Sequence, residues 1–329
     1  MEKLKQNPLV KTIGVTRLIL LLVIVAVYIL FAIMTPILRP GTTFVSYNRI
    51  LSALNYCYFI GFLALGIMVV ISTAGIDFSV GPIMFAAALI SGYCLTTYHL
   101  PLILCLLISI LTGTIWGIIE GWFVAYRYLP SFITSLAGIQ IGKGVGAVFT
   151  KTQSVSWPAV GSENSEFRYL VRVGNIPTGF IIFIVVAILM AIFMHKTKAG
   201  RYLLCIGSNK EAVRLSGVNT KRWEMLAYII SGTFAGLAAI FYVGAYTTVQ
   251  PGLGDTLNND AIAACVMGGT AMTGGVVSVL GVVIGAVIIA LLQEGILAMG
   301  FTVSYQYVLT GIIVLVAVIL NMAGQKRKS

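Results

Sequence analysis

Long apolar stretches alternate with short polar or glycine-rich connections along almost the whole chain. Seven of these stretches approach the roughly 20 residues that a helix needs to span a bilayer. Three further stretches are shorter or interrupted by glycine, but each is mostly apolar and flanked by turn residues. The pattern predicts an all-α polytopic membrane helix bundle of about ten membrane segments. The strong segments are 18–34, 55–73, 102–124, 180–194, 225–246, 276–297 and 305–322, and the weak ones are 83–98, 131–148 and 261–273.

The three weak segments are expected to lie inside the bundle. Lipid cannot satisfy irregular backbone at membrane depth, so such backbone must be covered by protein or line a wet cavity. Paired or alternate glycines at Gly252 and Gly254, and again at 268–269 and 274–275, bracket the segment 261–273. Such glycines break a membrane helix instead of packing it. Two interpretations of segment 261–273 therefore stay open: it spans the membrane, or it enters and leaves on the same side.

The composition excludes a water-soluble globule. Hydrophobic residues make up 59% of the chain and charged residues only 9%, whereas about a quarter of a soluble domain is charged. The five cysteines fall mostly in apolar segments without metal-type spacing, so we expect packing residues and no metal site. Nucleic-acid binding is also not expected, because the net charge of +11 is spread over separate loops without an aromatic platform.

Basic residues predict the orientation of the segments. With ten spans, 15 Lys and Arg residues fall on one side of the membrane and five on the other. The excess marks the cytoplasmic side, so both termini and the long loop at 195–224 should face the cytoplasm. This loop alone carries seven of the 21 Lys and Arg residues. We treat residues 1–329 as a single transmembrane domain with that loop inside it.

A weak internal repeat agrees with this topology. At a shift of about 174 residues, Glu120-Gly121 superposes on Glu294-Gly295, and the two helices would cross the membrane in opposite directions, as in inverted-repeat transporters. Glycines also recur at four-residue spacing, which lets membrane helices approach closely. The recurring sets are Gly113, Gly117 and Gly121, then Gly232 and Gly236, then Gly281 and Gly285.

The long loop contains the signature of a short helix. Ser208 is followed three residues later by Glu211, the spacing of a capping box, and Gly217 is suited to the position just after a helix. We therefore predict a helix over 209–216. A helix this short is marginal in water, so it needs a surface to pack on, either its own protein or a partner.

Four sequence motifs resemble those of the permease subunits of ABC sugar importers, in particular the ribose type, and they follow one another along the chain in the same order. The similarity runs from about Asn48 to the C-terminus. In this chain the motifs read EAVRLSG at 211–217, GIDFSVG at 75–81, QP at 250–251, and DAIAACVMGGT at 260–270 followed by GG at 274–275. Val213 replaces Ala in the Glu-Ala-Ala signature, and Phe78 replaces Leu in the second motif.

The resemblance implies a transport subunit of the bacterial cytoplasmic membrane that moves a monosaccharide or similar small polar solute inward. The family's partners would be an ABC ATPase subunit, a second permease chain, an extracytoplasmic substrate-binding protein and membrane lipid. ATP would be used by the partner, with no cofactor bound by this chain. The family's loop is the coupling helix, which maps here onto Ser208, Glu211, Ala212, Arg214, Leu215 and Gly217.

Polar residues in or near the apolar segments are candidates for the solute pathway, because burying them is costly. Asp77 and Ser79 have a competing and favoured interpretation, in which they cap the third helix. Glu120 and Glu294 should lie toward opposite membrane faces, and we interpret both as structural. Lys143 is expected to extend outward from its segment. The pathway candidates are the polar residues Asn55, Asp77, Gln140, Gln250, Asp260 and Gln293, together with Phe78.

No enzymatic role is indicated. The Gly-Lys pair at 142–143 lacks the spacing of a Walker sequence, and the two histidines lie far apart. Two other functions stay open: a branched-chain amino-acid ABC permease, and a self-contained secondary transporter with similar broken helices and intramembrane carboxylates.

Overall fold

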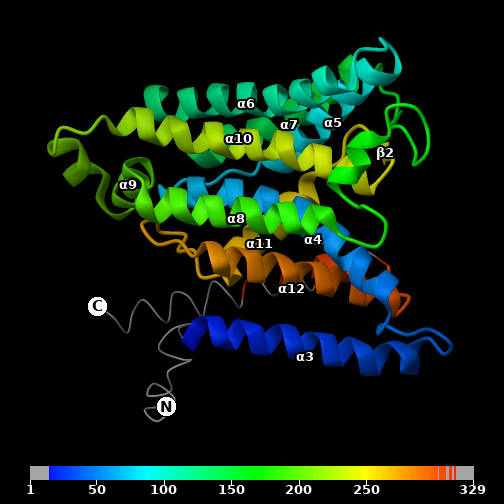
Figure 1. The fold of residues 1–329 in the computed structure, drawn as a ribbon. Helices are drawn as coiled ribbons and strands as arrows, with labels where there is room; N and C mark the ends of the chain where they lie inside the picture. Colours follow the sequence, from blue (N-terminus) through cyan, green and yellow to red (C-terminus); the bar gives the residue numbers. More distant parts are fainter. Residues whose placement is uncertain (1–14, 303, 309–310, 313–314, 316–329) are drawn as a thin grey trace.

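The computed structural model describes residues 15–302, 304–308, 311–312 and 315, and within this part the chain is mostly helical (Figure 1). The elements, in chain order, are α3 (Val15–Leu38), α4 (Tyr47–Ser72), α5 (Val80–Thr96), α6 (Leu102–Arg127), α7 (Ser131–Phe149), β1 (Val155–Ser156), η1 (Glu166–Leu170), α8 (Thr178–Lys196), α9 (Lys198–Leu215), α10 (Thr220–Ala245), β2 (Thr248–Val249), α11 (Asp255–Met267) and α12 (Val279–Ala298).

Seven of the described helices are long and apolar enough to cross a membrane, namely α3, α4, α6, α7, α8, α10 and α12. The chain is thus a polytopic helical membrane protein. α4 forms the centre, with 89% of its most apolar window buried, whereas the same fraction is 11% for α3 at the edge. The outer helices expose apolar side chains such as Ile103 and Val148, as expected of surfaces that face lipid.

Six of the strong segments predicted from the sequence are helices. α4 begins earlier than predicted, at Tyr47, because the Ser46 hydroxyl accepts the Arg49 N–H at 3.3 Å and caps the helix. Much of the seventh segment, 305–322, lies outside the described residues. Of that segment, residues 305–308, 311–312 and 315 are helical.

The weak segments differ from one another. α5 and α11 are enclosed by the bundle, as predicted, although α11 begins at Asp255, before the predicted start. The prediction was wrong for α7, whose buried residues are few and include Gly138, Gly142 and Gly146. Gly142 and Gly146 pack against α5, and Gly138 packs against Ser79 and Trp116. Much of the rest of α7 is exposed; for example, Val148 is 80% exposed. A short Gly-rich segment therefore does not by itself indicate an interior helix.

Glycine faces bring α6 and α10 into close contact. A Cβ placed on Gly113 would lie 2.1 Å from the carbonyl oxygen of Gly232, and one on Gly236 would lie 2.5 Å from that of Ser109. The small-residue spacing therefore does what the sequence predicted for these two helices. The same holds for Gly281 and Gly285 of α12, which pack against the backbone of Gly268, just after α11, and of Ala264 in α11.

The two ends of the bundle carry different structures. At one end lies α9, together with the beginning of α3 and of α10 (Figure 1). At the other end, β1 pairs antiparallel with β2, and the Arg168 guanidinium of η1 donates to the carbonyls of Pro158 and Gly244. Burial lowers the pKa of Arg168 from its usual value. The end with α9 corresponds to the predicted cytoplasmic side.

Candidate functional site

Two helices begin next to each other inside the bundle. Gly81 in the first turn of α5 approaches Gly254, the residue before α11, so closely that a Cβ on Gly81 would lie 2.2 Å from the Gly254 carbonyl oxygen. Asn258 of α11 accepts the Gly81 N–H at 2.6 Å. From this junction α5 runs toward the β-strand end, where Gly92 contacts Trp157, and α11 runs toward the α9 end.

Asp77 lies in the extended segment that leads from α4 to this junction. Its Oδ1 accepts the Ser79 N–H at 2.8 Å, and its Oδ2 accepts the Ser231 hydroxyl of α10 at 2.7 Å. In the described part of the chain, Asp77 accepts no N–H from inside α5, and Ser79 makes no side-chain cap. The helix-cap interpretation was therefore wrong: Asp77 ties the segment to α10, and Asn258 supplies the bond to the start of α5.

Glu120 of α6 belongs to the same buried cluster. Ser79 Oγ lies 2.8 Å from Asp77 Oδ1, 2.9 Å from Glu120 Oε2 and 2.9 Å from Trp116 Nε1. The indole N–H donates, and the serine hydroxyl has one proton, so it donates to only one of the two carboxyl groups. The other carboxyl must donate to Ser79, which requires a proton on one of the two acids. With Glu120 only 1% exposed, a shared proton also avoids burying two negative charges together.

A second buried acidic group, Asp260, lies within α11. Asp260 accepts hydrogen bonds from the Tyr56 hydroxyl of α4 and from the Gln306 amide, the latter at 3.2 Å. These bonds fix two side chains that line a cavity of about 370 Å³. The cavity is lined from both halves of the chain, including Gln293 of α12 and Gly254 at the helix junction.

Two ion pairs connect other elements of the bundle. Arg49 Nη1 lies 2.7 Å from Glu294 Oε1 and joins α4 to α12. Lys143 of α7 pairs with Asp255 in the first turn of α11, so it does not simply extend outward as the sequence predicted. Glu120 and Glu294 therefore belong to separate clusters, as expected for acids near opposite membrane faces.

The loop at the α9 end contains a kinked helix. Asn209 has non-helical backbone angles, and its Oδ1 accepts the Ala212 N–H at 2.9 Å, which begins a new helical turn. The predicted capping box was wrong, because Ser208 Oγ donates to the Leu204 carbonyl and Glu211 pairs with Arg214. Asn209, one residue later than predicted, is therefore the cap of the short helix, and its amide oxygen accepts the N–H three residues along.

The end of this short helix was predicted correctly. Gly217 has φ +84°, the left-handed conformation that favours glycine after a helix. Leu215 is 73% exposed, and Glu211 and Arg214 form an exposed ion pair. The hydrogen bonds from the Arg214 guanidinium lower the pKa of Glu211 from its usual value, so the pair stays charged at neutral pH.

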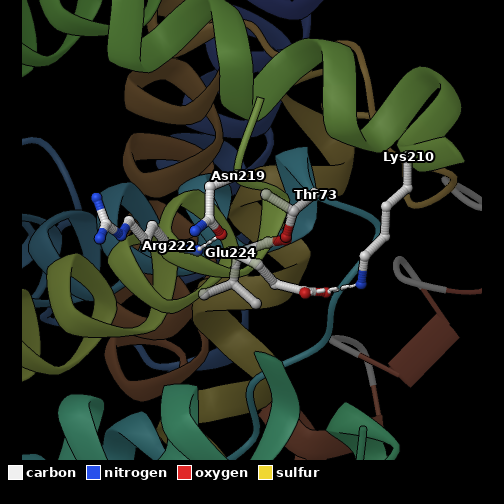
Figure 2. A network of polar contacts seen from close by, with 6 residues as sticks. Thr73, Lys210, Asn219, Arg222 and Glu224 are labelled. Atoms are coloured by element: carbon white, nitrogen blue, oxygen red, sulfur yellow. Dashed lines mark hydrogen bonds and ion pairs between the residues drawn. The ribbon is translucent and has the colours of Figure 1, made fainter. Parts of the chain in front are cut away.

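An ion pair joins the short helix to the bundle. Lys210 Nζ lies 2.9 Å and 2.7 Å from the two carboxylate oxygens of Glu224 in α10, as Figure 2 shows. Asn219 accepts the Arg222 N–H at 3.2 Å and caps α10 just before this point. Both residues of the ion pair, together with Thr73 at the end of α4, line a second cavity of about 210 Å³.

Comparison with known proteins identifies the family. Residues 49–318 match the model of the family described as branched-chain amino acid transport system / permease component. The chain belongs to this permease family. It is 30% identical to the ribose import permease protein RbsC of Haemophilus influenzae, covering 92% of this chain and 93% of the relative. It is 28% identical to the xylose transport system permease protein XylH of the same organism, covering 96% and 99%. No solved structure matches the permease.

The structure places the predicted pathway residues of the permease at several different positions. Gln293 lines the larger cavity, and Asp260 bonds to two of its lining residues. The other candidates are not brought to that cavity. Asn55 accepts the Tyr58 hydroxyl at 2.8 Å, Phe78 packs on Phe132, Asp77 lies in the buried acid cluster, and Gln140 and Gln250 are exposed.

Sequence reasoning missed residues in both the acid cluster and the cavity. Ser231 and Trp116 are ordinary members of apolar helices, and nothing in their spacing indicated a carboxylate partner. Tyr242 and Tyr246 were within reach of prediction, because two tyrosines four residues apart lie on one face of a helix near its end. All five cysteines of the permease are free, and four of them are buried.

Proposed function

We propose that the protein is the transmembrane permease subunit of an ATP-driven importer of the ABC class, which carries a monosaccharide or similar small polar solute into the cytoplasm. The family match over residues 49–318 is the observation that carries this proposal. The ribose and xylose permeases among the relatives support the sugar class over an amino acid. The solute would cross the bacterial cytoplasmic membrane, with ATP bound and hydrolysed by a partner subunit.

The arrangement of the helices supports the inverted topology expected of such a permease. α4 and α10 pack together and run in opposite directions, as the pairs Tyr58–Phe241 and Gly66–Ser231 indicate. Each is followed by an extended segment and then by a helix that starts inside the bundle, α5 or α11. On this basis we propose two inverted repeats, about ten spans, and both termini in the cytoplasm.

The short helix after Asn209 is the proposed contact with the ATPase. It is exposed, it carries an apolar side chain at Leu215, and it begins after Asn209 and ends before Gly217. The coupling residues are Ser208, Glu211, Ala212, Arg214, Leu215 and Gly217. Ser208 precedes the kink, and its hydroxyl donates to the Leu204 carbonyl in the preceding helical turn, so its proposed role is to hold the position of the kink.

A chain of contacts leads from this helix to the junction of α5 and α11. Lys210 bonds Glu224 at the start of α10, and Ser231 two turns further along bonds Asp77. Asp77 in turn holds Ser79 immediately before α5. Closure of the partner ATPases would therefore shift α10 and, with it, the segment that enters the junction. A second permease chain and an extracytoplasmic binding protein complete the proposed assembly.

Reconstitution tests the proposal. Proteoliposomes that contain the permease with its ATPase should take up D-ribose or D-xylose only when ATP and the binding protein are present. The permease alone, given a proton or sodium gradient, should be inactive. Uptake by the lone chain would overturn the proposal in favour of a secondary transporter. Uptake of leucine in place of either sugar would overturn the substrate class.

A further inference from the structure

The cavity of about 370 Å³ lies where the two proposed repeats meet. Its lining comes from α4 and α5 in the first half, and from α10, α11 and α12 in the second. It reaches Gly254 at the helix junction, where two helices begin inside the bundle. The volume is within the range of small-molecule sites. Its chemistry indicates what kind of molecule would bind.

One part of the lining is a continuous group of aromatic rings. The ring centroids of Tyr56 and Phe59 are 5.0 Å apart, and those of Phe59 and Tyr242 are 5.3 Å apart. Tyr242 lies 5.0 Å from Phe85 and 5.0 Å from Tyr246. Aromatic faces carry partial negative charge and favour the weakly positive C–H groups of a sugar ring, while tyrosine hydroxyls bond sugar hydroxyls.

Amide and hydroxyl groups supply the polar part of the lining. The Oε1 atom of Gln293 is buried and has no hydrogen-bond partner among the described residues. Thr256 and Gln306 also line the cavity, and Gln306 is held in place by its bond to Asp260. A buried carbonyl oxygen without a donor is costly, and a solute hydroxyl would satisfy it.

The described lining of the cavity carries no unpaired charge. Among its described lining residues, Asp255 is the one carboxylate, and no Lys, Arg or His takes part. Asp255 is paired with Lys143 and also lies in the first turn of α11, where it complements the positive end of that helix. The carboxylate of an amino-acid zwitterion would therefore find no cationic side chain in this lining, which is unfavourable, whereas a neutral polyol needs none.

We propose that this cavity binds a neutral polyhydroxylated solute of monosaccharide size during transport, with Tyr242 and Gln293 in direct contact with it. This inference rests on the proposed function and assigns a binding site to it. The aromatic rings would hold the C–H face of the sugar, and the amides would bond its hydroxyls.

Two conservative substitutions test the site in the full assembly with ATPase and binding protein. Tyr242→Phe removes only the hydroxyl, and Gln293→Leu removes only the amide. At subsaturating D-ribose or D-xylose, each should lower ATP-driven uptake about five-fold, the effect of one lost hydrogen bond. Tyr28→Phe in α3 is the matched control outside the cavity and should leave uptake unchanged. ATP hydrolysis stimulated by the binding protein should persist in all three.

A second measurement reports binding without transport. With Cys205→Ser removing the exposed thiol, Thr256→Cys places a new thiol in the cavity lining. Millimolar D-ribose or D-xylose should slow its modification by a small methanethiosulfonate reagent, whereas leucine should not. Unchanged modification, or wild-type uptake in both cavity variants while the unmodified assembly imports sugar, would overturn the site and leave the proposed function standing. An unmodified assembly that imports no sugar would instead refute the proposed function itself.

Discussion

Lys210 and Glu224 form the ion pair that joins the exposed short helix after Asn209 to α10 (Figure 2). Nζ bonds both carboxylate oxygens, and Glu224 is only 8% exposed, whereas Lys210 is on the surface. A mostly buried carboxylate that loses its cation is unfavourable, so the contact is stronger than an exposed pair. The pair is therefore placed to transmit movement of the short helix to α10.

We expect Lys210→Ala to lower the amount of solute imported per ATP hydrolysed several-fold, because the short helix would move without α10. Lys210→Arg should preserve coupling. Uptake and phosphate release measured together in proteoliposomes give the ratio. Lys198→Ala, an exposed lysine of the same loop, is the control. Partial recovery in the charge-swapped pair Lys210→Glu with Glu224→Lys would support the contact, and a wild-type ratio in Lys210→Ala would refute it.

Substitutions at the surface of the short helix should uncouple the permease from its ATPase without unfolding it. Glu211→Lys places two positive charges side by side, and Gly217→Pro fixes φ near −65° where the helix end needs +84°. Both should abolish sugar-dependent ATP hydrolysis while the protein elutes as a folded species in size-exclusion chromatography. Glu163→Lys, on an exposed loop at the opposite end, should behave as wild type. Normal coupled transport in either test variant would contradict this assignment.

The sequence predicted the helices well because hydrophobic length and glycine spacing are local properties. Gly113 and Gly232, for example, lie in a close helix contact of the kind that four-residue spacing indicated, although the spacing did not identify the partner helix. The burial of α7 was mispredicted, because its composition resembles that of α5 and only packing separates a peripheral helix from an interior one. Helix ends depended on single side chains, so the choice between Ser208 and Asn209 as a cap could not be made from spacing alone.

The acid cluster and the cavity were much harder to predict. Ser231 and Asp77 are separated by 154 residues, and neither a motif nor a period connects them. The sequence identified Asp77 as unusual but gave it the wrong partner. Likewise, Gln293 was recognised as polar in an apolar helix, but the aromatic rings of α4, α5 and α10 that share its cavity looked like ordinary core residues.

The shared proton in the acid cluster makes a specific prediction about Glu120. Glu120→Gln should be tolerated, because the new amide N–H can donate to Ser79 while the Ser79 hydroxyl donates to Asp77, so neither contact needs a protonated acid. Glu120→Ala should lower the free energy of unfolding by about 1–3 kcal/mol, since Trp116 and Ser79 lose a partner. Thermal unfolding of the purified permease in lipid nanodiscs gives the comparison. Equal stability of the Gln and Ala variants would contradict the hydrogen-bond count.

The glycine contact at the start of α5 and α11 predicts a steep dependence on size. A Cβ at Gly81 would lie 2.2 Å from the Gly254 carbonyl oxygen and 2.6 Å from Asn258 Oδ1, so Gly81→Ala must push the two helices apart. Overpacking of this kind costs about 1–3 kcal/mol, and we expect a lower folded yield together with impaired transport. Gly144→Ala in α7 is the matched control, because nothing lies within 4 Å of its added Cβ and alanine favours helix there. Fluorescence-detected size-exclusion chromatography and uptake would compare the two. If Gly81→Ala equals Gly144→Ala in both measurements, the junction is not the close contact described above.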